Sequence, residues 1–249
     1  MEINKAIEIK GLVKRFGNIT AVDGLSLYIN KGEVFGLLGP NGAGKTTIIN
    51  ILSGLVKPTE GSASVGGFDV DKQIDKIREV IGVCPQQPAY YKYLTGRENI
   101  SMYGELHSMD SEVIKSRTQY LVEKIGLTES VDRKTEGYSG GMVRRINLAM
   151  ALVHDPPFVF LDEPTAAMDP QSRRATWDFI RDFKERDKTV ILTTHYIEEA
   201  EELADRVGII DHGKLIALNT PKVLIQENGA GNLEDVFIKL TGRRIREEI

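Results

Sequence analysis

The sequence predicts an α/β protein with a mixed, largely parallel sheet, a small antiparallel β layer and an inserted α-helical subdomain. Two observations support the α/β class. A buried-strand run at 34–38 leads through a glycine-rich turn into a helical pattern, and strand runs at 158–161 and 189–194 flank a second helical stretch. A third observation defines the insert, because β-branched runs disappear from about 88 to 154.

The small β layer is predicted from the first thirty residues. Apolar residues alternate with polar ones at Ile7 and Ile9, and again at Leu25, Leu27 and Ile29. Glycine-containing turns punctuate the stretch. A period of two places one side of each strand against a core, so we expect short antiparallel strands here.

The larger sheet is predicted from three apolar or β-branched runs. Val34–Leu38 is a continuous run, and the segment 46–55 after it has apolar residues at helical spacing. The other strands are 158–161 and Thr189–Thr194, with a helix expected at 172–183 between them. Strands that alternate with helices are typical of a parallel sheet with helices on its faces.

The helical part of the insert should begin near residue 96. Thr95 and Glu98 fit a capping box, in which each side chain accepts from the backbone N–H of the other residue. We therefore expect a first core part at 1–87, the helical insert at 88–154, a second core part at 155–220 and a C-terminal helical tail at 221–249.

Three further helices are predicted near the end of the chain. In 197–207, apolar residues mark one face and glutamates at 198, 199, 201 and 202 mark the other, which we interpret as solvated. In the tail, Thr220-Pro221 fits an N-cap and first turn, and Asn228-Gly229 fits a helix end. A last amphipathic helix is expected at 233–240, ended by Gly242.

Composition restricts the classes of partner. The 249 residues are 41% hydrophobic and 27% charged, which is typical of a globular protein. A formal charge of −4 gives no broad basic field, so no nucleic-acid partner is expected. Cys84 is the single cysteine, no secretion signal is recognised, and no apolar run reaches the roughly 20 residues of a membrane span. We therefore expect a cytoplasmic protein.

A phosphate-binding loop is predicted between the first buried strand and its helix. Gly39-Pro40-Asn41-Gly42-Ala43-Gly44-Lys45-Thr46-Thr47 contains the pattern G-x-x-x-x-G-K-[ST]. Glycines let successive backbone N–H groups wrap phosphate oxygens, and the positive end of the helix dipole adds to the attraction. Lys45 would bridge the β- and γ-phosphates, and the Thr46 hydroxyl would coordinate Mg²⁺. The core is thus predicted to be a P-loop NTPase with ATP and Mg²⁺ as cofactors. The candidate nucleotide contacts in the loop are Gly39, Asn41, Gly42, Gly44, Lys45, Thr46 and Thr47.

Two acidic residues end the strand run at 158–161. Phosphoryl transfer needs a carboxylate for the metal and a group that activates the attacking water, both at the end of a buried strand beside the loop. Asp162 would hold Mg²⁺ through water, and Glu163 would face the γ-phosphate as general base.

The segment Tyr138-Ser139-Gly140-Gly141-Met142 is similar to the signature LSGGQ, and through its motifs and their order the chain resembles the ABC ATPases over nearly its whole length. Ser139, Gly140 and Gly141 offer a hydroxyl and free N–H groups at a helix N-terminus. Tyr138 and Met142 depart from the family pattern, and Met142 is given no nucleotide role. The resemblance implies a head-to-tail dimer, in which this segment faces the nucleotide bound to the other subunit.

The resemblance also implies roles for residues outside these motifs. Gln86 matches the Q-loop glutamine, which touches Mg²⁺ and water, although Gln87 beside it leaves the register open. His195 matches the switch histidine, which contacts the γ-phosphate and orients the water. Asp169 matches the D-loop aspartate at the dimer interface, and a simple turn at that position is the alternative. Phe16 matches the aromatic that stacks on adenine, but stacking does not distinguish ATP from GTP.

The resemblance implies an ATP-hydrolysing subunit that energises a transporter. The permease would be a separate transmembrane polypeptide, and this chain would lie on the inner face of the cell membrane. Tyr90, Tyr91 and Tyr93 would line the groove that accepts the permease. Two such subunits would form a homodimer or a heterodimer.

The residues Val143-Arg144-Arg145 and the late helical segment before 241–243 resemble the exporter branch, which carries drugs, lipids or polysaccharides outward. The alternatives are an importer ATPase subunit, a soluble ABC ATPase that acts in translation or DNA repair, and a nucleotide-binding regulator that does not turn over. The last of these conflicts with the intact set of Lys45, Asp162, Glu163 and His195.

Overall fold

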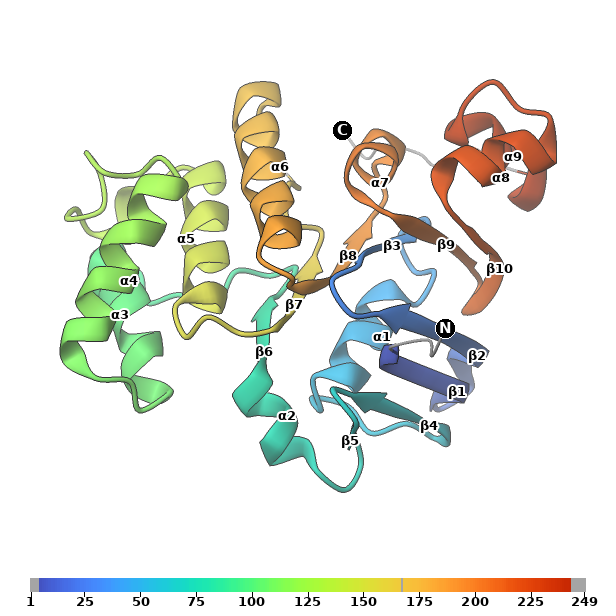
Figure 1. The fold of residues 1–249 in the computed structure, drawn as a ribbon, viewed down its shortest axis with the longest axis horizontal. Helices are drawn as coiled ribbons and strands as arrows, with labels where there is room; N and C mark the ends of the chain where they lie inside the picture. Colours follow the sequence, from blue (N-terminus) through green and yellow to red (C-terminus); the bar gives the residue numbers. More distant parts are fainter. Residues whose placement is uncertain (1–4, 167, 243–249) are drawn as a thin grey trace.

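The computed structural model describes residues 5–166 and 168–242 (Figure 1). Its strands are β1 (Lys5–Phe16), β2 (Ile19–Asn30), β3 (Val34–Leu38), β4 (Glu60–Val65), β5 (Phe68–Asp69), β6 (Ile81–Cys84), β7 (Phe158–Asp162), β8 (Thr189–Thr194), β9 (Arg206–Asp211) and β10 (Lys214–Asn219). Its helices are α1 (Lys45–Leu52), α2 (Ile74–Val80), α3 (Gly96–Leu106), α4 (Ser111–Lys124), α5 (Gly140–Leu152), α6 (Pro170–Glu185), α7 (Ile197–Leu203), α8 (Pro221–Asn228) and α9 (Leu233–Thr241).

The larger sheet is mixed and mostly parallel, as predicted. Its strand order is β10-β9-β3-β8-β7-β6, and all neighbours in the described sheet are parallel except β10 with β9. The three predicted strands β3, β7 and β8 lie side by side in the middle of this order. Strands buried on both faces give continuous apolar runs, which is why these three could be predicted.

The antiparallel layer has the order β2-β1-β4-β5. Strands β1 and β2 are twelve residues each, so the prediction of short strands was wrong. Register shifts interrupt their pairing at several points, and such bulges bend a long hairpin so that it can curve over a core. The apolar sides of this layer, of α1 and of the larger sheet share one cluster, in which Ile9, Ile48 and Phe35 are all buried.

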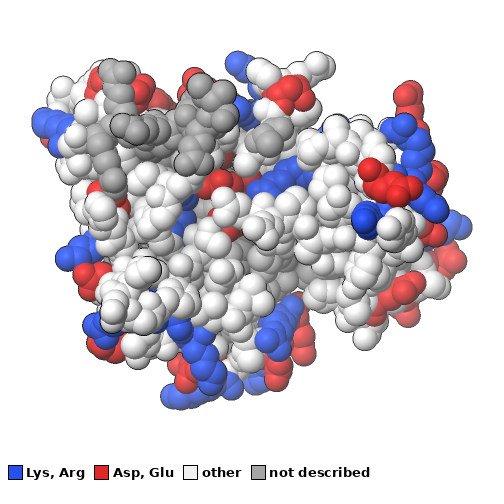
Figure 2. Space-filling view, turned by 180° about the vertical axis from the view of Figure 1, so that it is seen from behind, with Lys and Arg blue, Asp and Glu red and all other residues white. Residues whose placement is uncertain are grey.

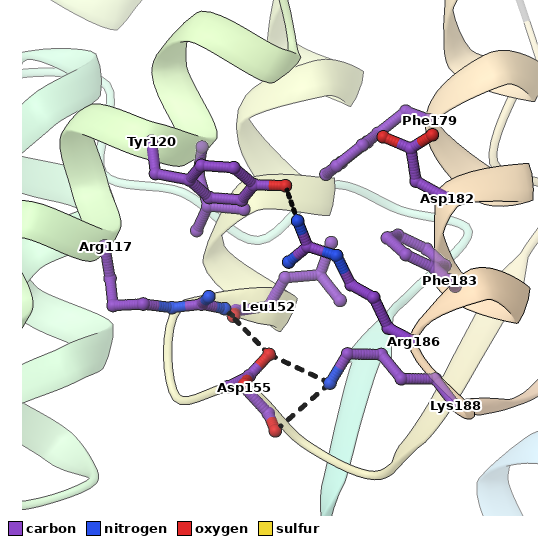
Figure 3. Close-up of a pocket in the computed structure, with 10 residues that line it drawn as sticks. Arg117, Tyr120, Leu152, Asp155, Phe179, Asp182, Phe183, Arg186 and Lys188 are labelled. Carbon is purple, nitrogen blue, oxygen red and sulfur yellow. Dashed lines mark hydrogen bonds and ion pairs between the residues drawn. The ribbon is translucent and has the colours of Figure 1, made fainter.

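The inserted helices α3, α4 and α5 lie together on one side of the larger sheet (Figure 1). The predicted capping box at the start of α3 is present, with the Thr95 side chain accepting from Glu98 N and Glu98 accepting from Thr95 N. Side chains of α4 meet those near α6 in the seam drawn in Figure 3, where Tyr120 points toward Arg186. This seam joins the helical segment to the sheet-bearing part.

Two helices are shorter than predicted. Helix α1 ends at Leu52, and Leu55, expected on its apolar face, is 69% exposed. Helix α7 ends at Leu203, because the chain becomes extended at Ala204 and continues as β9, which pairs with β3 and contains Val207. The acidic face of α7 is also not wholly solvated.

Glu199 on α7 is completely buried, which corrects the prediction of a solvated acidic face. The Thr165 hydroxyl and the Trp177 indole N–H both donate to its Oε1 atom. These donors explain how a carboxyl group is tolerated inside the protein, since buried polar groups require hydrogen-bond partners.

The C-terminal helices have the predicted caps. The Thr220 side chain accepts from Val223 N at the start of α8, and Gly229 ends that helix in the left-handed conformation. Gly242 ends α9 in the same way. Within the described ranges no helix is long and apolar enough to cross a membrane. The rear face carries acidic and basic side chains intermixed around its edges (Figure 2).

Candidate nucleotide-binding and catalytic site

The predicted catalytic residues and the phosphate loop lie at the carboxyl ends of four neighbouring strands. The phosphate loop follows β3, His195 follows β8, Asp162 ends β7 and Glu163 comes directly after it. Gln86 lies two residues beyond β6, at the end of the sheet order. Carboxyl ends of parallel strands meet at one edge of a sheet, so residues up to 156 positions apart in the sequence come together there.

The phosphate loop has close backbone contacts that require glycine. A side chain at Gly39 would place its Cβ 2.3 Å from the Ile210 carbonyl oxygen. At Gly44, where φ is +104°, a Cβ would lie 2.3 Å from the Ala21 carbonyl oxygen. Gly44 is the N-cap of α1 and has no side chain to satisfy the first N–H groups of the helix. The loop therefore leaves donors at a helix N-terminus, which favours an anion.

Four predicted catalytic residues converge in this structure. Glu163 Oε1 lies 3.1 Å from His195 Nδ1 and 3.6 Å from Lys45 Nζ, and Gln86 Nε2 donates to Glu163 Oε2 at 3.1 Å. Lys45 also donates to the carbonyl oxygens of Gly39 at 2.7 Å and Pro40 at 3.0 Å. The side chain that makes this contact belongs to Gln86, and its assignment as the Q-loop glutamine stays a prediction.

Burial and charge have opposite effects on Glu163. Burial alone raises the pKa of its carboxyl group, but His195, Lys45 and Gln86 outweigh that effect and hold the pKa below its ordinary value. Burial lowers the pKa of the Lys45 ammonium, and the charges of Glu163 and Asp162 oppose that change. The site thus keeps a charged carboxylate in a position closed to most solvent.

Two residues that the sequence did not place in the site form hydrogen bonds with Asp162 and Glu163. The Thr193 hydroxyl donates to Asp162 Oδ1 and accepts from Glu163 N. Arg144 on α5 donates to the main-chain carbonyls of Asp162 and Glu163. Two adjacent arginines in a mostly apolar helix and a threonine at a buried strand end were the available signs, but neither specifies its partner.

A pocket of about 470 Å³ lies over these residues. Its lining includes Phe16, Ala21, Gln86, Glu163 and residues 41–47. Phe16, half exposed at the end of β1, borders the same pocket as the phosphate loop, as adenine stacking would require.

The residues present fit a Mg²⁺ site in which the protein supplies only some of the ligands and the phosphates supply others. In the described part of the chain, no group of three or more His, Cys, Asp and Glu side chains could enclose a metal ion. Asp162, 2% exposed, and Thr46 at the start of α1 provide one carboxylate and one hydroxyl instead. Mg²⁺ prefers such partial sites, where phosphate oxygens and water complete the octahedron.

The other predicted nucleotide contacts lie outside the pocket. Ser139 is the N-cap of α5, and its exposed side chain accepts from Met142 N at 3.3 Å. Gly140 is exposed and Gly141 partly so. Asp169 is exposed next to α6, where it accepts from Ser172 N at 2.9 Å. Ala167 of the same loop and residues 243–249 lie outside the described residues.

The fold and the pocket define a P-loop nucleotide-binding protein. Residues 22–166 match the family described as ABC transporter. The chain belongs to the ABC transporter family, as one of its ATP-binding, ATP-hydrolysing subunits.

Several relatives cover most of the chain. The linearmycin resistance ATP-binding protein LnrL of Bacillus subtilis is 42% identical over 97% of this chain and 76% of its own length. The daunorubicin/doxorubicin resistance ATP-binding protein DrrA of Streptomyces peucetius is 43% identical over 92% and 69%. The Nod factor export ATP-binding protein I of Rhizobium sp. (strain N33) is 40% identical over 93% and 76%. The prediction of an exporter-type subunit is confirmed.

Solved structures agree with the fold. The ATP-binding subunit of an ABC transporter superposes with a TM-score of 0.87 at 24% identity, covering 95% of this chain and 99% of that one. A dimeric ATP-binding cassette in a post-hydrolysis state with ADP and Pi gives a TM-score of 0.80 at 28% identity, covering 86% and 98%. The α/β class with its mixed sheet and antiparallel layer is confirmed by these neighbours.

Proposed function

We propose that Glu163 is the general base of ATP hydrolysis in this subunit, and that the hydrolysis drives export of a drug through a separate permease. The observation that carries the catalytic part is the convergence of Lys45, Gln86 and His195 on the Glu163 carboxylate. A buried, charged carboxylate at a strand end beside a phosphate loop has the position that a general base requires.

In this proposal the attacking water gives its proton to Glu163 as its oxygen bonds to the γ-phosphorus, and the bond to the ADP oxygen breaks. His195 and Gln86 orient the water, and Lys45 neutralises charge on the phosphate oxygens. Bound Mg²⁺, held by Thr46 and through water by Asp162 with Gln86 nearby, would supply further charge neutralisation. Phe16 stacks on adenine, and the loop from Gly39 to Thr47 wraps the phosphates.

The catalytic assignment is tested with Glu163→Gln, which keeps the size of the side chain and removes its basicity. We expect kcat for ATP hydrolysis to fall at least 100-fold, the scale of a general base, with ATP affinity changed less than about 3-fold. Glu105→Gln, on an exposed part of α3, is the control. Retained hydrolysis in Glu163→Gln would show that another group is the base.

We propose that the loop at 89–94 is where the permease docks, which would hold this chain on the cytoplasmic face of the membrane. Tyr91 and Tyr93 are 61% and 65% exposed, whereas Tyr90 is partly buried and packs inward, which restricts the expected anchors to two. Asn99 fixes the loop by accepting from Tyr91 N and donating to Tyr91 O. Alanine at both exposed tyrosines should weaken co-purification with the permease, and unchanged co-purification would refute this docking surface.

The substrate class is proposed from the names of the relatives, which include resistance proteins for linearmycin and daunorubicin. Cells that lack this chain should become more sensitive to the exported drug, and the original chain but not Glu163→Gln should restore resistance. Unchanged sensitivity across a panel of such antibiotics would exclude this class of substrate while leaving the ATPase chemistry intact.

A further inference from the structure

Arg144 is a buried arginine whose guanidinium group donates hydrogen bonds to four main-chain carbonyl oxygens. The residue is 2% exposed and lies on α5. Its Nη1 donates to the carbonyls of Pro85 at 2.7 Å and Gln86 at 2.5 Å, and its Nη2 donates to those of Asp162 at 2.7 Å and Glu163. Burying a cation is costly, so four acceptors on one guanidinium indicate a specific use of its geometry.

The four carbonyls belong to the two segments that carry the proposed water-orienting amide and the proposed base. These segments follow β6 and β7, which are neighbours in the sheet. The planar fork of arginine can bridge two pairs of oxygens at once, whereas a lysine ammonium has three donors on a single atom. One side chain therefore fixes the distance between the backbones of Gln86 and Glu163.

The backbone of Glu163 needs such support. Its φ is +50°, a left-handed conformation that residues with side chains seldom adopt. Glu163 N donates to the Oγ1 and carbonyl oxygen of Thr193, each at 3.1 Å, which holds the amino side. Arg144 holds the carbonyl side. Strained backbones at functional sites persist only when neighbouring groups hold them in this way.

We infer that Arg144 is a positioning residue for ATP hydrolysis, which aligns the Glu163 carboxylate and the Gln86 amide with the attacking water by holding both backbones. The inference rests on the proposed role of Glu163. Arg144 also lies on the helix that follows the signature segment, because Ser139 of that segment is the N-cap of α5.

The experiment compares Arg144→Lys with Arg117→Lys in the full chain. Arg117 is a matched control, because it also donates to main-chain carbonyls of the α5 region, those of Leu152 at 2.8 Å and Val153 at 3.2 Å, but at the far end of the helix (Figure 3). We expect Arg144→Lys to lower kcat about 100-fold, the effect of a misplacement near 1 Å, with KM for ATP changed less than about 3-fold. Arg117→Lys should change both constants less than about 3-fold.

A double variant separates positioning from general loss of structure. In Glu163→Gln, Arg144→Lys should lower the residual single-turnover rate less than about 10-fold further, because the base is gone and only the Gln86 amide is left to align. A further loss near 100-fold would overturn the inference, as would a normal kcat in Arg144→Lys alone. If Arg144→Lys does not fold, Arg144→Gln replaces it, and failure of both to fold assigns Arg144 to stability and overturns the inference. A wrong base assignment is detected separately, as normal hydrolysis in Glu163→Gln.

Discussion

At the scale of single residues, neighbouring groups keep the buried Glu163 carboxylate in its charged form. Glu163 is 5% exposed, and burial by itself favours its protonated form. His195 and Lys45 lie close enough to reverse that preference, and the pKa stays below the ordinary value for glutamate. A base whose folded pKa is lowered stays charged as the pH falls, until the pH reaches that lowered value.

His195→Asn should therefore shift the acidic limb of the kcat profile to higher pH, because the pKa of Glu163 rises when its first partner is lost. The rate itself should fall at least 10-fold, since water orientation is also lost. The profile is measured with saturating ATP between pH 5 and 8, in the range where the variant remains folded. His212→Asn, on an 81% exposed side chain, is the matched control. Superimposable profiles for His195→Asn and the original chain would contradict this account.

The phosphate loop and the base could be predicted from the sequence because each is recognised from a short continuous segment. Gly39 and Lys45 belong to one nine-residue motif, and Glu163 lies directly after a strand run. Arg144 and Thr193 could not be assigned, because their partners are main-chain and side-chain atoms that only the fold brings close. The roles assigned to Ser139 and Asp169 stay predictions.

At the scale of elements, local patterns predicted helix boundaries best where capping residues mark them. Caps are determined by neighbouring residues, so α3, α8 and α9 begin where expected, and α8 and α9 end at the predicted glycines. Helix α7 was predicted too long because an apolar run continued into β9, and strand pairing with β3 decides where the helix stops. The division of the chain at 87/88, 154/155 and 220/221 stays a prediction.

The buried carboxyl of α7 gives a prediction for stability. Burial raises the pKa of Glu199, although Thr165, Thr194 and Trp177 oppose this by hydrogen bonding. A carboxyl with a raised folded pKa contributes stability that is present at low pH and lost as the pH rises through that pKa. Glu199→Gln removes the titration and keeps an oxygen for Thr165 and Trp177. Its Tm should equal or exceed that of the original chain at pH 8, and the difference should shrink toward pH 5.

Glu199→Leu is the paired variant, since leucine has similar volume but leaves the Thr165 hydroxyl and the Trp177 N–H without an acceptor. The cost of each unsatisfied donor is about 1–3 kcal/mol, so a clear fall in Tm is expected at every pH. Thermal unfolding followed by circular dichroism measures both variants. A Tm for Glu199→Leu above that of Glu199→Gln would mean that the hydrogen bonds of α7 do not matter to the fold.

At the scale of the whole molecule, the groups of the proposed ATP site lie in two separate places. Lys45 and Glu163 border the pocket, whereas Ser139 and Asp169 are exposed outside it. One solved relative with 28% identity is a dimeric cassette with ADP and Pi. The order β10-β9-β3-β8-β7-β6 could not be derived from sequence, because it depends on which distant strands pair. That order decides which residues share a pocket.

If two copies form the working dimer, each ATP lies between Lys45 of one copy and Ser139 of the other, and two different defects should complement. Lys45→Ala and Ser139→Arg should each reduce ATPase activity at least 100-fold alone, because both sites of each homodimer are damaged. Mixing the two chains produces heterodimers in which one site has intact Lys45 and intact Ser139, while the other site has both defects. Activity should therefore recover to a measurable fraction of the original on mixing, and the recovered rate should vary with the mixing ratio and be greatest near equal amounts.

Each variant measured alone at the same total concentration is the control, because a homodimer of one variant has no intact site. No recovery at any ratio would indicate that this chain pairs with a different ATP-binding subunit or that Ser139 does not serve the partner's nucleotide.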